Sequence, residues 1–406
     1  MNVLKAAIVG LTLISANTLV RADVITDWNN TAMDVMKAVN VGGNPWTRSM
    51  AMVNVSMSDA INSVQNRYSR YMTEAPINPD ASAEAAAAAA AREILMRQYP
   101  GQKARIDVAF AETMQTIPDN PSRAAGIELG EKVAGAIFAE RQSDATNMPD
   151  TYRPLTTAGV WVPTTSPLFP QYATAKPWGM DSASQFRPAP PPALNSTLYA
   201  RDYNETKEMG GVKSTKRTDA QSDAVRFWTQ ANLGPAWFHA ARQASARHNL
   251  AVAESARVFA LMSMAFANCF ILDWDAKFQY NFWRPITAIR NGDQDGNDAT
   301  ERDAGWQPLN TTPMHPEYPS QAGINVGAAR SILEAVFGNG TEDLVATDTS
   351  DARLSRKFTS FAQMAQEQKE VRVWGGIHFR NSLEVGDAMG RKVADHLLAN
   401  YMKPAR

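Results

Sequence analysis

The sequence predicts an all-α fold made of helical bundles. Two observations lead to this class: long stretches of the chain lack both proline and glycine, and their apolar residues recur at helical rather than alternating spacing. We find no convincing strand pattern and no internal repeat in the sequence. With 406 residues and 44% apolar composition, the chain can form a sizeable core.

The charge balance and the cysteine count exclude some partners and some structural features. The chain carries 40 basic and 41 acidic residues, so nucleic acid is not an expected partner. Cys269 is the only cysteine, which excludes an internal disulfide. Because it lies in an apolar run, we interpret it as a small buried hydrophobic residue rather than as a nucleophile.

Residues 1–22 have the layout of a signal peptide. Lys5 precedes an apolar run that ends at Val20, and Ala22 places a small residue before Asp23. A buried first helix or a membrane anchor is the alternative, but polar residues between positions 15 and 18 leave too short an apolar core for a bilayer span. We expect an exported protein, periplasmic or secreted, with no stable membrane span after this segment is removed.

An N-terminal helical region is expected from residue 23 to 145. Ser82 and Glu84 introduce an alanine-rich run that ends near Tyr99, and the stretch 121–141 resembles a helix entered through proline. Residues 146–217 then change character, because prolines interrupt any periodicity. Their tryptophans, tyrosines and phenylalanines favour burial, so this interval is predicted to be an ordered linker or lid rather than a disordered segment.

A second helical bundle is expected from residue 218 to 406. Thr218 and Gln221 have the spacing of a capping box at its first helix. The stretch 258–274 is almost entirely apolar, but its few polar residues favour a buried core helix over a membrane span.

Two cations lie together near the end of this core helix. Lys277 and Arg284 are seven residues apart, and two helical turns would bring them to nearly the same face. Farther along, Ser320 is expected to be the N-cap of a helix, whose free amides at Gln321 and Ala322 would suit an anion.

A third cation and a histidine complete the candidate site. Arg372 closes one predicted helix, two glycines break it, and His378 is expected at the start of the next. Positive neighbours should keep this histidine neutral, as a nucleophile or a metal-oxide ligand requires. The alternative is a core imidazole bonded to a carbonyl.

In this order and spacing, the motifs Lys277-x6-Arg284-Pro285, Pro319-Ser320 and Arg372-x3-Gly376-x-His378 resemble those of the superfamily of vanadium-dependent haloperoxidases and type 2 phosphatidic acid phosphatases (PAP2). The resemblance implies a helical catalytic bundle preceded by an N-terminal helical region. It also implies that three cations clamp vanadate or phosphate, that a serine donates a hydrogen bond, and that the final histidine bonds vanadium or attacks phosphorus. By motif, the cofactor-binding residues are Lys277, Arg284, Ser320, Arg372 and His378, with His378 as the metal ligand. We add Gln321 as a cofactor-binding residue because of its free amide at the expected helix start.

The sequence departs from the superfamily pattern at two positions. Ala322 stands where the second motif carries an acid/base histidine, and Ser382 stands where the phosphatases have an aspartate. His315 matches the position of a second histidine in algal bromoperoxidases, and we take it as the candidate substitute for the missing acid. The candidate catalytic residues are therefore His378, His315, Arg284 and Arg372.

The resemblance leaves three functions open. We favour a haloperoxidase-like oxidoreductase, a peroxidase that binds vanadate and oxidises halides with hydrogen peroxide. The first alternative is an exported PAP2-type acid phosphatase, which would need no cofactor and would attack phosphate esters through a phosphohistidine. The second is a non-catalytic oxyanion-binding homologue, which Ala322 suggests.

Overall fold

The computed structural model describes residues 23–72, 75–163, 165–230, 233–347 and 354–405. The expected signal peptide, residues 1–22, lies outside these ranges and stays a prediction. The described residues form thirteen α-helices, four short 3-10 helices and one two-stranded sheet, which confirms the all-α class. The α-helices are α1 (Val24–Ala38), α2 (Gly43–Gln65), α3 (Ala83–Gln98), α4 (Lys103–Gln115), α5 (Pro121–Glu140), α6 (Thr197–Gly210), α7 (Asp219–Gln230), α8 (Leu233–Arg247), α9 (Val252–Tyr280), α10 (Pro285–Arg290), α11 (Gln321–Phe337), α12 (Phe361–Trp374) and α13 (Arg380–Asn400).

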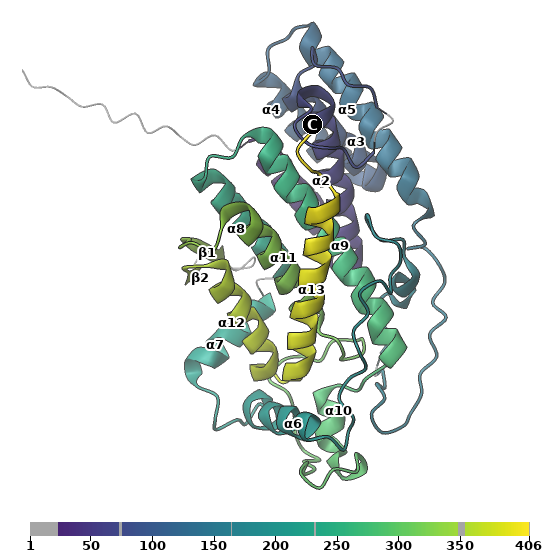
Figure 1. Ribbon diagram of the computed structural model, residues 1–406, viewed down its shortest axis with the longest axis vertical. Coiled ribbons are helices and arrows are strands. Elements are labelled where there is room, and N and C mark those ends of the chain that lie inside the picture. Colours follow the sequence, from purple (N-terminus) through teal and green to yellow (C-terminus); the bar gives the residue numbers. More distant parts are fainter. Residues whose placement is uncertain (1–22, 73–74, 164, 231–232, 348–353, 406) are drawn as a thin grey trace, which may run out of the picture.

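Helix α9 forms the centre of the molecule. Figure 1 shows the N-terminal helices at one end, α6 and α10 at the other, and α9 connecting the two regions. Helix α2 packs along α9 on one side, while α11 and α13 pack against it on another. Among the described helices, α9 alone is long and apolar enough for a membrane span, but 94% of its most apolar window is buried inside the molecule. It is the predicted core helix, and it carries the buried Cys269.

Helices α11 and α13 approach each other through glycines. A Cβ built on Gly323 would lie 2.6 Å from the Leu383 carbonyl oxygen, and one built on Gly386 would lie 2.6 Å from the Ser320 carbonyl oxygen. Gly327 and Gly390 have equally close backbone neighbours on the facing helix. Only glycine permits this approach, because any side chain would have to push the backbones apart.

The capping signals predicted several helix starts correctly. Ser82 accepts a hydrogen bond from the Ala85 amide, and Thr218 and Gln221 form the expected reciprocal capping box. The small sheet was not predicted. Its strands, β1 (Leu344–Thr347) and β2 (Ser355–Phe358), pair antiparallel but have four residues each, and β2 exposes much of its length. Such short strands leave too little alternation to recognise.

The proline-rich segment lies along α9. The Trp161 amide donates to the Asn281 carbonyl over 2.7 Å, and the Trp178 amide donates to the Asn268 side-chain oxygen over 2.7 Å. Helix α6 interrupts the interval expected to be a linker. It begins after the last proline of the run, with Ser196 as its N-cap, and the absence of further proline allows a helix there.

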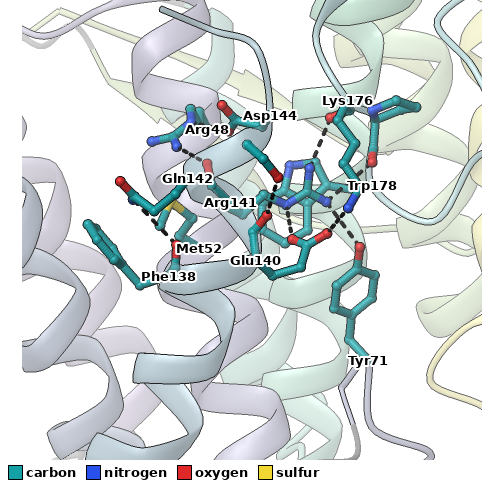
Figure 2. Close-up of polar contacts among 12 residues, drawn as sticks. Arg48, Met52, Tyr71, Phe138, Glu140, Arg141, Gln142, Asp144, Lys176 and Trp178 are labelled. Atoms are coloured by element: carbon teal, nitrogen blue, oxygen red, sulfur yellow. Dashed lines mark hydrogen bonds and ion pairs between the residues drawn. The ribbon is translucent and has the colours of Figure 1, made fainter.

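A buried arginine joins the proline-rich segment to the N-terminal helices (Figure 2). The Arg141 side chain is fully buried, with its guanidinium carbon 3.6 Å from the centre of the Trp178 ring. It donates to the carbonyl oxygens of Lys176 (2.9 Å) and Pro177 (3.2 Å) and to the Tyr71 hydroxyl (3.0 Å). One side chain thus satisfies carbonyls of a segment that has little regular structure of its own.

We predict that Arg141→Met lowers the free energy of unfolding by about 3 kcal/mol, because it leaves these carbonyls and the Glu140 carboxylate without their buried cation. The midpoint of urea unfolding measures the effect. Arg153→Met, at an exposed position of the same segment, is the control and should change stability by less than about 0.5 kcal/mol. Equal midpoints for the two variants would contradict the assigned role.

Candidate functional site

Lys277 lies fully buried in the last turn of α9 and holds the loop that precedes α11. Its ammonium donates to the Glu317 carbonyl over 3.0 Å and also to the Pro319 carbonyl. The Asp273 carboxylate, one turn earlier on the same helix, lies 3.6 Å from the Lys277 ammonium nitrogen. The lysine therefore fixes the backbone on both sides of Tyr318, immediately before Ser320.

Arg284 lies outside α9, so the expectation that it shares a helix face with Lys277 is wrong. The helix ends at Tyr280 because Asn281 adopts a left-handed conformation, with φ of 49°. Arg284 instead precedes α10 in extended conformation. Its guanidinium donates to the His315 carbonyl (2.9 Å) and to the Ile377 carbonyl (2.8 Å), so it joins the two loops that carry the candidate histidines.

His378 is held from both ring nitrogens. Its Nδ1 lies 2.8 Å from a Glu317 carboxylate oxygen, and its Nε2 lies 3.2 Å from Nη1 of Arg284. An arginine can only donate, so Nε2 must be the acceptor and Nδ1 must carry the proton. The same Glu317 oxygen accepts the Phe379 amide over 3.0 Å. The arrangement leaves the Nε2 lone pair on the cationic side of the ring.

Glu317 is the residue of the candidate site that the sequence analysis missed. It is fully buried and supplies the carboxylate that Ser382 cannot supply. Asp387, one of the acids that follow His378 in the sequence, pairs with Lys369 and Arg391 instead. The one available signal was an acid immediately before Tyr318-Pro319-Ser320, which only the fold brings to a histidine 61 residues away.

His315 lies beside the same arginine. Its Nδ1 is 3.0 Å from Nη2 of Arg284, and its ring packs on Trp274 with centroids 4.9 Å apart. Burial, then the charges of Arg284 and Lys277, hold the pKa of His315 well below its ordinary value. It is therefore neutral at neutral pH.

Two of the remaining predicted residues, Gln321 and Arg372, line a cavity of about 360 Å³. Ser320 is the N-cap of α11 by backbone conformation, but its hydroxyl makes no capping bond. Within the described part of the chain, Ser320 Oγ, Gln321 Nε2 and Arg372 Nε are buried polar atoms without a hydrogen-bond partner. The unpaired donors of Gln321 and Arg372 at this cavity, with that of Ser320 next to Gln321 in the chain, indicate a site for an anion, because unpaired burial is costly.

A family model for the second helical-bundle domain of VCPO matches residues 257–406. The vanadium chloroperoxidase of Curvularia inaequalis is 26% identical over 178 residues, which cover 37% of this chain and 29% of that protein. Residues 257–406 thus resemble a domain of the vanadium-dependent haloperoxidases. The resemblance seen in the motifs is confirmed at this level, although the match spans less than a third of the curated relative.

Solved structures of the superfamily share the fold over most of the chain. A bacterial vanadium-dependent iodoperoxidase has a TM-score of 0.79 at 24% identity, covering 94% of this chain and 98% of its own. A holo-type bacterial vanadium-dependent chloroperoxidase has a TM-score of 0.71 at 18% identity, covering 87% and 90%. The likeness includes the N-terminal helical region, which the family model does not cover.

The side chains of this candidate site fit an oxoanion rather than a bare metal cation. No group of three or more His, Cys, Asp or Glu residues suited to a metal ion occurs in the described ranges. The site instead combines Lys277, Arg284 and Arg372 with one histidine whose Nε2 lone pair faces a cation. Vanadate and phosphate both match such a set of donors.

Burial shifts the titration of the charged groups in this site. It raises the pKa of Glu317 to about 7, although Arg284 and Lys277 act in the opposite direction, and it raises the pKa of Asp273 to about 7. Burial lowers the pKa of Lys277 to about 8, against the attraction of Asp273. Burial, Arg284 and Lys277 hold the pKa of His378 well below its ordinary value, so the imidazole is neutral at neutral pH.

We predict that Glu317→Gln changes how stability depends on pH. Because folding raises the pKa of Glu317 from 4.5 to about 7, the native state binds more protons than the unfolded state between these values, and this residue's contribution to stability falls as pH rises. The free energy of unfolding of the parent, minus that of the variant, should therefore fall by on the order of 2 kcal/mol between pH 5 and pH 8. Denaturant titrations at several pH values measure this difference.

Glu112→Gln, on the exposed face of α4, is the matched control and should leave the pH dependence unchanged. A difference that rises with pH would show that Glu317 titrates in the opposite sense.

Proposed function

We propose that this protein is a vanadium-dependent haloperoxidase that binds vanadate and oxidises halides with hydrogen peroxide. The supporting observation is the state of His378: Glu317 holds the Nδ1 proton, and Nε2 keeps a lone pair beside a buried cation. A neutral imidazole in this tautomer can bond the metal of an oxoanion. The family-model match of residues 257–406 and the fold shared with bacterial haloperoxidases also support the proposal.

Each side chain has a distinct part in holding the anion. Lys277, Arg284 and Arg372 would neutralise its charge, and the Ser320 hydroxyl and the Gln321 side-chain amide would donate hydrogen bonds to it. Arg284, which contacts Nε2 of His378, would have to give up this contact for the Nε2 lone pair to become available to the anion. Bound vanadate would supply the chemistry that activates hydrogen peroxide toward halides.

Glu317 acts as a positioning residue. It holds the His378 ring through Nδ1, as carboxylates commonly do for metal-bound histidines. His315 enters the proposal as a neutral hydrogen-bonding group near the anion, because its lowered pKa leaves it no stored proton at neutral pH. His315 therefore does not fully replace the acid/base histidine whose position Ala322 occupies.

We predict that the protein binds vanadate and then oxidises bromide or iodide with hydrogen peroxide. His378→Ala should weaken vanadate binding and lower halide oxidation at least 100-fold, and Glu317→Gln should weaken binding about 10- to 100-fold. Calorimetry measures the binding, and the consumption of a halogen acceptor measures the turnover. His248 is partly exposed and pairs with Glu342, away from the candidate site. His248→Ala is therefore the control for the loss of a histidine elsewhere. Tight vanadate binding without halide oxidation would select the non-catalytic oxyanion-binding homologue.

The second candidate is an exported acid phosphatase. One observation favours it: the pair of His378 and Glu317 has the form of a nucleophilic histidine with a carboxylate behind it. Such an enzyme would attack phosphorus through Nε2 and form a phosphohistidine. Ala322, at the start of α11, cannot protonate the leaving group, so esters with good leaving groups would be the favoured substrates.

We predict that Ala322→His raises the hydrolysis of p-nitrophenyl phosphate by roughly 10²- to 10⁴-fold if phosphate esters are the natural substrates, because it restores a general acid. Release of p-nitrophenolate measures the rate. Adding His378→Ala to this variant should abolish the gain. A variant that remains inactive toward this ester would argue against the phosphatase.

A further inference from the structure

The cavity that reaches Arg372 and Gln321 has walls of aromatic side chains. Trp46 comes from α2, Trp228 from α7, and Phe266 and Phe270 from α9, so three separate parts of the chain contribute rings to one space. An oxoanion binds through charge and hydrogen bonds, so these apolar walls do not contribute to binding it. Ligand pockets for organic molecules combine aromatic walls with a few polar groups, which is the composition seen here.

The aromatic walls are held in position before any ligand enters. The Trp228 indole nitrogen donates to a Glu367 carboxylate oxygen over 2.7 Å. Trp46 packs edge-on against Phe238, with ring centroids 5.5 Å apart. Phe270 packs against Trp274 in a tilted arrangement, with ring centroids 5.4 Å apart. A preformed wall lowers the entropic cost of binding a flat ligand.

The volume exceeds the needs of the anion. The cavity measures about 360 Å³, and each water in the liquid takes about 30 Å³, so it has room for roughly a dozen waters. A tetrahedral oxoanion has five heavy atoms and fills less than half of this space. The remainder suits one aromatic ring with a small substituent.

Asn325 supplies a polar group away from the cations. It lies one turn after Gln321 on α11, is 3% exposed, and lines the cavity. Its side-chain oxygen is a buried acceptor without a partner in the described part of the chain. An acceptor would repel an oxoanion but would receive a hydrogen bond from a hydroxyl group. The Arg372 guanidinium, which also lines the cavity, disfavours a positively charged ligand.

We propose that this cavity binds a single-ring phenol as the organic substrate of the site. The ring lies among the four aromatic side chains, and its hydroxyl donates to Asn325 Oδ1. The binding stands on the cavity alone, whereas the reaction rests on the proposed halide oxidation. In that reaction hypohalous acid transfers its halogen to a ring carbon: the carbon–halogen bond forms as the oxygen–halogen bond breaks, and the ring proton joins the released hydroxide as water.

The test measures phenol binding to the full protein without vanadate, peroxide or halide, by ligand-observed NMR titration, with toluene as the apolar comparison. We expect saturable binding of phenol, at least fivefold tighter than that of toluene. Asn325→Leu should remove this preference, whereas Asn400→Leu, at the exposed end of α13, should retain it. Absence of saturable binding, or equal affinities of phenol and toluene for the parent protein, overturns the proposal whether or not the variant folds.

A second measurement separates this proposal from the haloperoxidase function. With vanadate, bromide and peroxide present, a bound phenol should give a ratio of ortho to para bromophenol that differs from the ratio given by free hypobromite. If halide is oxidised but the two ratios agree, the phenol site is wrong and the haloperoxidase function stands. If phenol binds selectively but no halide is oxidised, the haloperoxidase function fails and the binding site stands.

Discussion

The compensation of buried charge at the end of α9 is the constraint on which the rest of the site depends. Lys277 and Arg284 are almost completely buried, as are the carboxylates of Asp273 and Glu317. Burying an isolated charge costs far more than one contact can return, so each of these groups needs several partners. The partners are largely main-chain carbonyls, among them those of His315, Glu317, Pro319 and Ile377. The cations that would bind an anion therefore also fix the loops that deliver the other site residues.

Because the same buried groups compensate charge and position the loops, the site can combine cations with a neutral histidine. The carboxylate of Glu317 offsets the cations and, at the same time, selects the tautomer of His378. A site with cations alone would have no group to hold the Nδ1 proton, and a site with more acids would repel the anion. In the described geometry Glu317 lies at Nδ1 of His378 and the Arg284 guanidinium lies at Nε2, so the carboxylate and the cation contact opposite nitrogens of the ring.

Sequence reasoning predicted the residues with a fixed spacing in the chain and missed those that the fold brings together. The spacing of Lys277, Arg284, Ser320, Arg372 and His378 was enough to recognise the superfamily. Glu317 could not be assigned in this way, because nothing in the chain records that it meets His378. The shared helix face of Lys277 and Arg284 was a wrong inference from regular periodicity, which the left-handed Asn281 interrupts. Capping signals succeeded because they depend on neighbouring residues only.

The glycine contacts between α11 and α13 have a mechanical consequence. Ser320 stands at the start of one helix and His378 just before the other, and the close contact of the two backbones joins them as one stiff body. The distance between Ser320 and His378 is thus set by the packing of the two helices, and movement of the loops changes it little. A side chain at position 386 would push α11 and α13 apart and so change the distance between Ser320 and His378, even if Gly386 itself contacts no ligand.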